Sequence, residues 1–231
     1  MMKLNSDLSS LAVFHSENAK WTPSPALGVE RMMLERVGNE KVTRASTIVK
    51  YQPGSKFPTH VHDGGEEFLV LEATFSDMTG DFSQGFYVRN PVGSHHEPWS
   101  EGGTVIFVKL GQMDPADKAY VRIDTKGADW QCHTQLGMKV LPLHTFGLEY
   151  VRLVSLGPEC ALNETAFPNG AEVFVITGRL NVSKTLLKAK DWLRAPAGSN
   201  LSIRSNSGAI FYLKTGHLAV GTLPESGVEN H

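Results

Sequence analysis

The sequence predicts an all-β protein made of two similar units, and three observations support this prediction. Short runs rich in Val, Ile, Phe and Tyr recur along the whole chain, for example at residues 105–110 and 209–214. The 22 glycines and 12 prolines are spread between these runs instead of gathering in one linker, which is the pattern of many short strands separated by turns. An internal repeat also divides the chain into two comparable halves. Only residues 6–14 and 183–193 could hold a short helical piece.

Three blocks of the first half recur 105 residues further along the chain. The matching blocks are 67–71 with 172–176, 87–94 with 192–199, and 103–111 with 208–216. Three blocks at one offset indicate a duplicated unit of about 100 residues, which is a usual domain size. A chain of 231 residues has room for one or two domains. The repeat favours two, joined near residues 115–135.

The composition argues against several classes of protein. Hydrophobic residues make up 41% of the chain and charged residues 20%, which are globular values and not those of a disordered chain. The 22 Lys and Arg against 24 Asp and Glu offer no broad attraction for nucleic acid or an anionic membrane. No apolar run reaches the roughly 18 residues of a transmembrane helix, and the N-terminus lacks a signal peptide's apolar region. With only two cysteines, expected to be reduced thiols, we expect a cytoplasmic protein without a cysteine-based zinc site.

A histidine pair in the first unit has the spacing of a metal site. His60 and His62 are separated by one residue, so on a strand both imidazoles project to the same face and could share one ion. The segment 63–65, Asp-Gly-Gly, is typical of a tight turn because adjacent glycines allow positive φ. We expect this turn to bring Glu66 back on a neighbouring strand, beside the pair.

A second segment offers a third imidazole. His95 and His96 follow a turn at 91–93, Pro-Val-Gly, and in an extended chain they point to opposite faces, so only one can enter the site. Three imidazoles and one carboxylate suit zinc, iron(II), manganese, nickel or copper, and they do not suit calcium or magnesium. Because each imidazole must lose a proton to bind, metal affinity should fall below about pH 6.5.

The two segments resemble both signature motifs of the cupin superfamily at their glycines, proline, histidines and glutamate. Cupins are small β-barrels, of double-stranded β-helix or jelly-roll form, with a metal site inside the barrel. The resemblance therefore implies two tandem cupin barrels. It also implies a ligand set for the metal ion: His60, His62, Glu66 and His96.

Within the cupins, the phrases at 66–77 and 87–102 resemble the cupin domain of ChrR-type anti-sigma factors, in which this domain binds zinc. The resemblance implies one divalent transition metal ion per chain, with zinc as first choice and iron(II) or manganese as second. It also implies a sigma factor as a partner. ChrR-type proteins bind their sigma factor through a separate helical, zinc-binding domain, however. Because residues 1–34 are too few to hold it, we expect no sigma factor to bind.

The repeat predicts that only the first unit binds metal. At the 105-residue offset, the four expected ligands match Thr165, Phe167, Ala171 and Leu201. A small loop shift would instead place Asn163 and Thr165 opposite the histidine pair, and neither alignment restores a ligand set. Glu67 matches Glu172, so we interpret Glu67 as scaffold and Glu66 as ligand. The same comparison assigns three more recurring residues to the fold: Arg89, Pro91 and Ser94.

These observations lead to a domain plan and to ranked functions. We expect an N-terminal extension over 1–34 that packs on the barrels, a metal-binding cupin domain over 35–120, and a degenerate, metal-free cupin domain over 121–231. A regulatory or sensory zinc module ranks first, because four protein ligands saturate tetrahedral zinc. The alternative is a metalloenzyme, such as an iron(II)-dependent dioxygenase acting on a small organic substrate, because a six-coordinate ion keeps open positions.

The remaining expectations concern partners. A small organic ligand in the barrel and a homodimer are both compatible with the sequence, and neither nucleic acid nor a membrane is expected. The second unit could also hold an organic ligand of its own. We prefer for it the simpler role of packing against the first unit.

Overall fold

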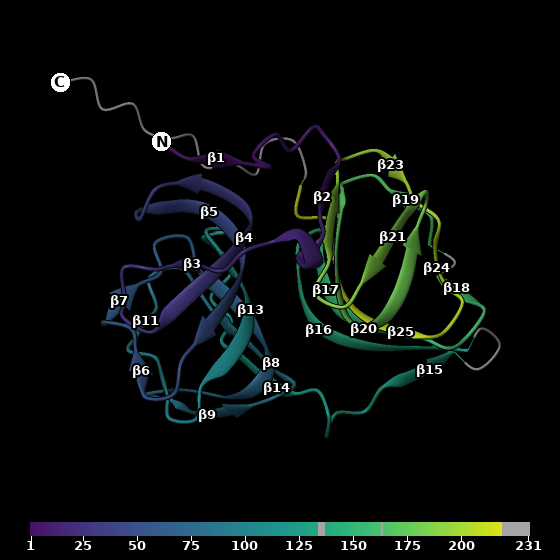
Figure 1. Ribbon diagram of the computed structural model, residues 1–231. Helices are drawn as coiled ribbons and strands as arrows, with labels where there is room; N and C mark the ends of the chain where they lie inside the picture. The colour runs from purple at the N-terminus through teal and green to yellow at the C-terminus, as the bar shows by residue number, and fades with distance from the viewer. Residues whose placement is uncertain (134–136, 163, 219–231) are drawn as a thin grey trace.

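The computed structural model describes residues 1–133, 137–162 and 164–218, and it consists of two β-barrels side by side (Figure 1). Within the described residues, the only helical segment is the 3₁₀ turn η1 (Ser16–Asn18). The expected helical pieces at 6–14 and 183–193 are therefore wrong. Both segments contain strands, because their apolar side chains find partners across a sheet.

The first barrel is built from ten strands. They are β4 (Val29–Gly38), β5 (Val42–Tyr51), β6 (Ser55–Lys56), β7 (His60–Val61), β8 (Glu66–Asp77), β9 (Gly80–Ser83), β10 (Phe86–Asn90), β11 (His95–His96), β12 (Trp99–Ser100) and β13 (Thr104–Leu110). In the large sheet, the central order is β4-β5-β13-β8-β10, and every pairing in it is antiparallel.

The second barrel repeats this plan. Its strands are β15 (Gln131–His133), β16 (Met138–Phe146), β17 (Glu149–Leu156), β18 (Cys160–Leu162), β19 (Ala166–Phe167), β20 (Ala171–Val182), β21 (Thr185–Lys188), β22 (Trp192–Ala195), β23 (Ser199–Asn200), β24 (Ile203–Ser205) and β25 (Ala209–Thr215). Here the central order is β16-β17-β25-β20-β22, so the two sheets correspond strand by strand. The duplication in the sequence is a duplication of the fold.

The remaining strands tie the two barrels together. They are β1 (Lys3–Leu4), β2 (Ala12–Phe14), β3 (Thr22–Pro23) and β14 (Val121–Asp124). The N-terminal strands β1 and β3 pair with β4 of the first barrel, whereas β2 pairs with β22 of the second. Strand β14 follows the predicted domain boundary at 120/121, in the part of the chain expected to form the second domain, but it pairs with β10 of the first barrel. The N-terminal residues thus contact both barrels (Figure 1).

The central strands bury both of their faces, because their side chains alternate between two cores. On β8, Phe68 and Val70 face the interior of the first barrel, and Leu69 and Leu71 face a core shared by both barrels. In this shared core, the ring of Phe107 stacks on that of Phe174, with centroids 4.2 Å apart. The second barrel has a large apolar core of its own. Three contiguous cores therefore hold the molecule together.

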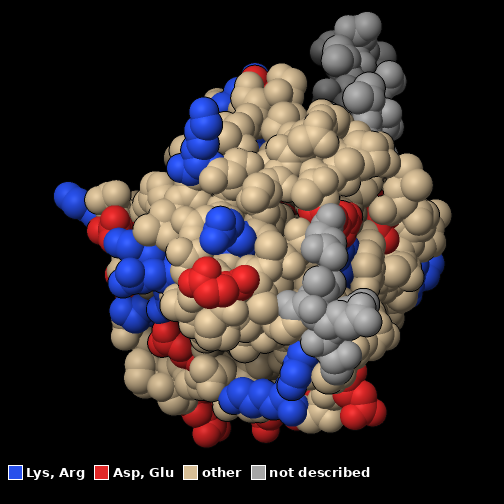
Figure 2. All heavy atoms as spheres, turned by 90° about the vertical axis from the view of Figure 1, so that its right-hand side faces the viewer, with Lys and Arg blue, Asp and Glu red and all other residues tan. Residues whose placement is uncertain are grey.

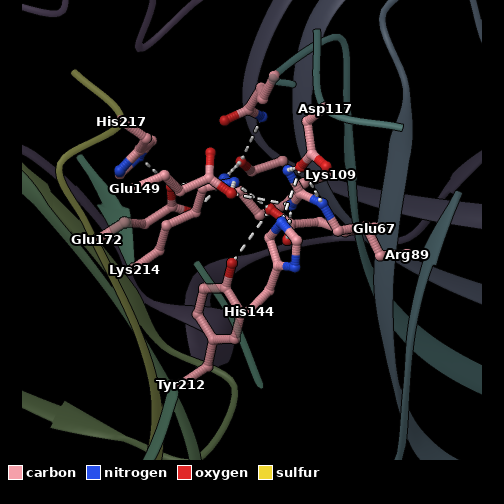
Figure 3. Close-up of polar contacts among 12 residues, drawn as sticks. Glu67, Arg89, Lys109, Asp117, His144, Glu149, Glu172, Tyr212, Lys214 and His217 are labelled. Carbon is pink, nitrogen blue, oxygen red and sulfur yellow. Dashed lines mark hydrogen bonds and ion pairs between the residues drawn. The ribbon is translucent and has the colours of Figure 1, made fainter. Parts of the chain in front are cut away.

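Charged side chains are distributed very differently outside and inside the molecule. On the face shown in Figure 2, Lys and Arg are interspersed with Asp and Glu over a mostly uncharged surface. A dense cluster of opposite charges is instead buried between the barrels (Figure 3). There Lys109 of the first barrel contacts Glu172 of the second, and Lys214 of the second contacts Glu67 of the first, both at 2.5 Å. Because Glu67 and Glu172, like Lys109 and Lys214, are repeat mates, the two ion pairs are reciprocal.

Two further observations bear on the sequence-based exclusions. In the described part of the chain, no helix is long and apolar enough to cross a membrane. Cys132 and Cys160 are both free thiols.

Candidate metal centre

The structure brings four potential ligands together inside the first barrel. One donor atom from each lies within 4.8 Å of all the others. The Nε2 atoms of His60 and His62 are 3.3 Å apart, and Oε2 of Glu66 lies 3.5 Å from Nε2 of both His62 and His96. Three imidazole nitrogens and a carboxylate oxygen at these separations fit one divalent transition metal ion.

The chain on either side of the first turn places three of these donors. His60 on β7 and His62 directly after it point into the barrel, while Val61 between them is 58% exposed, as expected for alternating side chains. The turn then brings two backbone segments into close approach, because a Cβ on Gly64 would lie 2.5 Å from Cα of Gly111. It leads to Glu66 at the start of β8. This strand pairs with β10 and β13 of the large sheet, and not with β7 in a hairpin.

The fourth donor comes from β11, which pairs antiparallel with β7 so that His96 lies opposite His60. The preceding turn is closed by a hydrogen bond from the N–H of Ser94 to the carbonyl of Pro91, at 3.0 Å. His96 is buried and its neighbour His95 is exposed. The structure therefore places His96 in the cluster and leaves His95 outside it.

Each ligand is also held by a second protein group. The contacts are His60 Nδ1 with the Pro58 carbonyl (2.8 Å), His62 Nδ1 with Ser94 Oγ (2.9 Å), His96 Nδ1 with Asp77 Oδ2 (2.9 Å), and Asn90 Nδ2 donating to Glu66 Oε2 (3.1 Å). With Nδ1 engaged, Nε2 of each imidazole is the atom left for a metal ion. Nε2 of His96 is buried and has no hydrogen-bond partner. The residues present thus fit a bound ion, which would satisfy that atom.

Burial and mutual charge set the protonation of the cluster. Burial lowers the pKa of His62, so this imidazole is neutral at pH 7. Burial would raise the pKa of Glu66, but His62 and His96 outweigh it and hold this pKa below its ordinary value. For His96, burial is outweighed by Glu66 and Asp77, which raise its pKa. The cluster thus offers an ionised carboxylate, which favours a cation at its centre.

The residues that orient the ligands are not apparent from the sequence. Ser94 recurs in the second unit, which assigns it to the fold, yet here it also contacts His62. Asp77 and Asn90 contact ligands 19 and 24 residues away in sequence, so no local spacing could reveal them. Glu67, interpreted as scaffold, points away from the cluster and contacts Lys214 and Arg89.

A cavity of about 310 Å³ adjoins the cluster. All four donors border it. Its other walls are mostly apolar and include Val49, Phe57, Phe75, Ile106 and Val108. Arg31, which is paired with the exposed Glu40, also borders it. A metal ion in the cluster would therefore face a space large enough for a small organic molecule.

The second barrel fills the corresponding positions with packing side chains. The N–H of Gly93 bonds to the carbonyl of His62 at 3.0 Å, and the N–H of Gly198 bonds to that of Phe167 at 3.1 Å. The 105-residue offset therefore holds at the site without a loop shift, and Asn163 lies outside the described residues. At this offset, the counterparts of three donors belong to the apolar core: Phe167, Ala171 and Leu201.

The comparisons with known proteins agree with this architecture. The family model of the ChrR cupin-like domain matches residues 9–114 and again residues 118–219. No curated protein matches the chain. Among solved structures, a candidate dioxygenase from Nostoc punctiforme is similar, with a TM-score of 0.73 and 14% identity over 93% of this chain and 86% of that one.

Two further structures share the fold. The bacterial pirin YhhW from Escherichia coli, in complex with nickel(II), has a TM-score of 0.67 and 13% identity over 89% of this chain and 98% of that one. The oxalate decarboxylase formate complex from Lactobacillus farciminis has a TM-score of 0.65 and 12% identity over 89% and 86%. At these identities the structures establish the fold alone. The two family matches, which cover both barrels, show that this chain belongs to the ChrR cupin-like family as a bicupin.

Proposed function

We propose that the first barrel is a mononuclear metalloenzyme site that binds a small organic substrate at a divalent transition metal ion. The observation that supports this most is the position of the four donors on the wall of the 310 Å³ cavity. A purely structural metal site is closed by protein ligands on all sides, whereas a catalytic site keeps a position open to a substrate. Here all four donor residues border the cavity, which offers room for a substrate beside the ion.

The ion would be held by His60, His62, Glu66 and His96. When bound, it supplies a Lewis acid that can polarise an oxygen atom of the substrate. The residues of the chain contribute orientation: Asp77 and Ser94 hold two imidazoles by their Nδ1 atoms. The mostly apolar walls favour a substrate with a hydrocarbon body. Iron(II) or manganese suits this proposal best, because each keeps positions beyond the four protein ligands.

The names of two structural neighbours are in line with an enzymatic role. One is a candidate dioxygenase and another is an oxalate decarboxylase in complex with formate. Both share the fold of this chain, and both are named for reactions of small oxygen-bearing molecules. They make a small oxygen-bearing substrate the first choice for this chain.

A second candidate function is a regulatory or sensory zinc module, and the match to the ChrR cupin-like family supports it. In that case Glu66 would complete a tetrahedral zinc site, and the ion would stabilise the barrel or report on a ligand. A cytoplasmic location stays a prediction, and so does the sigma-factor partner that the resemblance implies, although we do not expect this chain to bind one. Co-purification with a sigma factor is the direct test of the second.

Elemental analysis distinguishes the two candidates. The chain should be purified without oxygen or chelators, and its bound metals counted. Iron or manganese near one equivalent, with turnover of a small substrate, is the result expected for the enzyme. Two results together would overturn the enzyme proposal in favour of the sensory one. The first is one equivalent of zinc that resists extraction, and the second is an absence of turnover when the metal-free protein is reloaded with iron(II).

A further inference from the structure

One side-chain hydroxyl in the cavity beside the metal cluster has no partner in the fold. Tyr51, the last residue of β5, is only 6% exposed and borders the same cavity as the four donors. Its ring packs edge-on against Phe75, with centroids 5.8 Å apart at 90°. Its hydroxyl forms no hydrogen bond with any of the residues that the structure describes.

The other buried tyrosines of the barrels behave differently. The hydroxyl of Tyr87 donates to Glu67 at 2.6 Å, and that of Tyr212 donates to the same carboxylate at 3.2 Å. Buried tyrosine hydroxyls ordinarily find such a partner, because leaving one unpaired costs stability. Tyr51 is thus an exception, and it is found where a ligand would sit.

Alternation along β5 explains why Tyr51 faces the cavity. Thr47, Val49 and Tyr51 all border the cavity, while Ile48 between them belongs to the shared core of the two barrels. The position is therefore set by the register of the strand and not by a flexible loop. Burial first, and then the charge of Glu66, raise the pKa of Tyr51, so the phenol keeps its proton and can donate it in a hydrogen bond to an anionic oxygen.

We propose that Tyr51 donates a hydrogen bond to the oxygen atom through which a small organic ligand binds the metal ion. This inference rests on the proposed function and adds the ligand class: a small carboxylate or enolate whose anionic oxygen is bound by the metal ion and by the phenol together. The apolar part of the ligand would lie against side chains such as Phe57, Phe75 and Ile106, which border the same cavity. Tyr51 is then a specificity residue for oxygen donors.

The test uses the full chain loaded with cobalt(II), whose visible absorption reports on its ligands. Acetate and imidazole are titrated separately into the wild type and into Tyr51→Phe. Acetate carries an anionic oxygen that accepts a hydrogen bond, whereas a metal-bound imidazole offers no acceptor to the phenol. We expect acetate to bind at least about ten-fold more weakly to Tyr51→Phe, because hydrogen bonds to charged groups are strong. Imidazole affinity should not change.

Two controls separate this role from a structural one. The same substitution at the exposed Tyr120 should leave acetate binding unchanged. The melting temperature of apo Tyr51→Phe should equal or exceed that of the wild type, because the lost hydroxyl has no protein partner. A lower melting temperature would mean that the hydroxyl supports the fold and would contradict the proposal.

The outcomes also separate this inference from the proposed function. Equal acetate affinity in wild type and Tyr51→Phe, with one cobalt bound in each, overturns the role of Tyr51 alone. Failure of the cobalt-loaded wild type to bind acetate overturns the ligand class. A wild-type chain that takes up no cobalt overturns the proposed function itself.

Discussion

Two adjacent glutamates on strand β8, Glu66 and Glu67, have different roles in this molecule. Glu66 points into the first barrel, where it lies 3.5 Å from two imidazoles. Glu67 points to the other face of β8 and contacts Lys214 of the second barrel. Because side chains alternate along a strand, two adjacent glutamates face opposite sides of the sheet. One becomes a candidate metal ligand and the other a partner in a structural ion pair.

The first prediction concerns the histidine pair. His62→Ala should abolish tight metal binding, because it removes a donor from the centre of the cluster. Metal per chain, measured by elemental analysis after dialysis, should fall from about one equivalent to nearly zero if one ion binds as proposed. His95→Ala is the matched control, since His95 is exposed and should keep the full equivalent. Retention of metal by His62→Ala would refute the ligand set.

The second prediction concerns the group that orients His96. Asp77→Asn keeps the size of the side chain but removes the charge that helps to raise the pKa of His96. Metal affinity, measured by competition with a chromophoric chelator, should fall roughly 10- to 100-fold. Asp81→Asn, at an exposed neighbouring carboxylate, should change it by much less. Equal losses in the two variants would count against a specific role for Asp77.

At the scale of elements, the turn between β7 and β8 sets the geometry of the cluster. It links the histidine pair to Glu66, and it packs against the chain that follows β13. Gly111 closes this contact, since its N–H bonds to the carbonyl of Gly65 at 3.0 Å. Glycine is needed at position 64 because its backbone meets that of Gly111 with no room for a side chain.

The third prediction tests that close approach. A methyl group on Gly64 would lie 2.5 Å from Cα of Gly111, so Gly64→Ala must displace the turn. We expect a loss of about 1 to 3 kcal/mol in the free energy of unfolding, together with weaker metal binding. Gly102→Ala serves as control, because a methyl group on Gly102 would have no other atom within 4 Å. The measurement is urea unfolding of the two metal-free variants. Equal free energies of unfolding for Gly64→Ala and Gly102→Ala would contradict the expectation.

At the scale of the whole molecule, the two barrels are joined by the reciprocal ion pairs shown in Figure 3. Glu67 also accepts hydrogen bonds from Arg89 and Tyr87, at 3.1 and 2.6 Å. Repeat mates occupy equivalent positions, so each barrel supplies one carboxylate and one lysine to the other. Because buried charges are costly unless paired, this network favours one mutual arrangement of the barrels.

The fourth prediction breaks one half of the network. Glu67→Gln removes a buried negative charge that Lys214 and Arg89 contact, and leaves them Glu149 as a shared partner. It should cost about 3 kcal/mol of unfolding free energy, the lower end for breaking a buried ion pair. The control is Glu72→Gln, which breaks the surface pair between Glu72 and Lys190 of the other barrel. Exposed pairs contribute at most about 1 kcal/mol. Similar urea midpoints for the two variants would contradict the structural role of Glu67.

The fifth prediction concerns pH. Burial lowers the pKa of His217 to about 3, whereas in the unfolded chain a histidine takes up a proton below about pH 6.5. Between these limits the unfolded state binds more protons, so the free energy of unfolding falls as pH falls, by up to about 1.4 kcal/mol per pH unit from this residue.

His217→Gln removes this titration and keeps an N–H donor for Glu172, to which His217 is 3.2 Å away. The urea midpoint of the apo variant, measured with EDTA present, should therefore depend less steeply on pH between 6.5 and 5 than that of the wild type. Burial would raise the pKa of Glu172, the partner of His217, but Lys109 outweighs it and holds this pKa well below its ordinary value, so the carboxylate does not titrate in this window. If the urea midpoints of wild type and variant depend on pH with the same slope, His217 is not the source of this pH dependence.

By itself, the sequence determined the all-β class, the duplication and the identity of the clustered residues. The class and the duplication follow from local or periodic information, namely short apolar runs, glycines at turns and a constant offset of 105 residues. The set of four clustered residues follows from the resemblance to the two cupin motifs. The repeat also separated Glu66 from Glu67, since only one of them recurs. These predictions needed no knowledge of which strands meet.

Only the tertiary structure decided what surrounds those residues. Asp77 reaches His96, Tyr51 faces the cavity, and β2 joins the second barrel because strands far apart in sequence meet in the folded molecule. The reciprocal pairing of Glu67 with Lys214 likewise exists only once two barrels pack face to face. The physical reason is common to all of them: hydrogen bonds and ion pairs act over a few ångströms of space, and sequence distance does not measure that space.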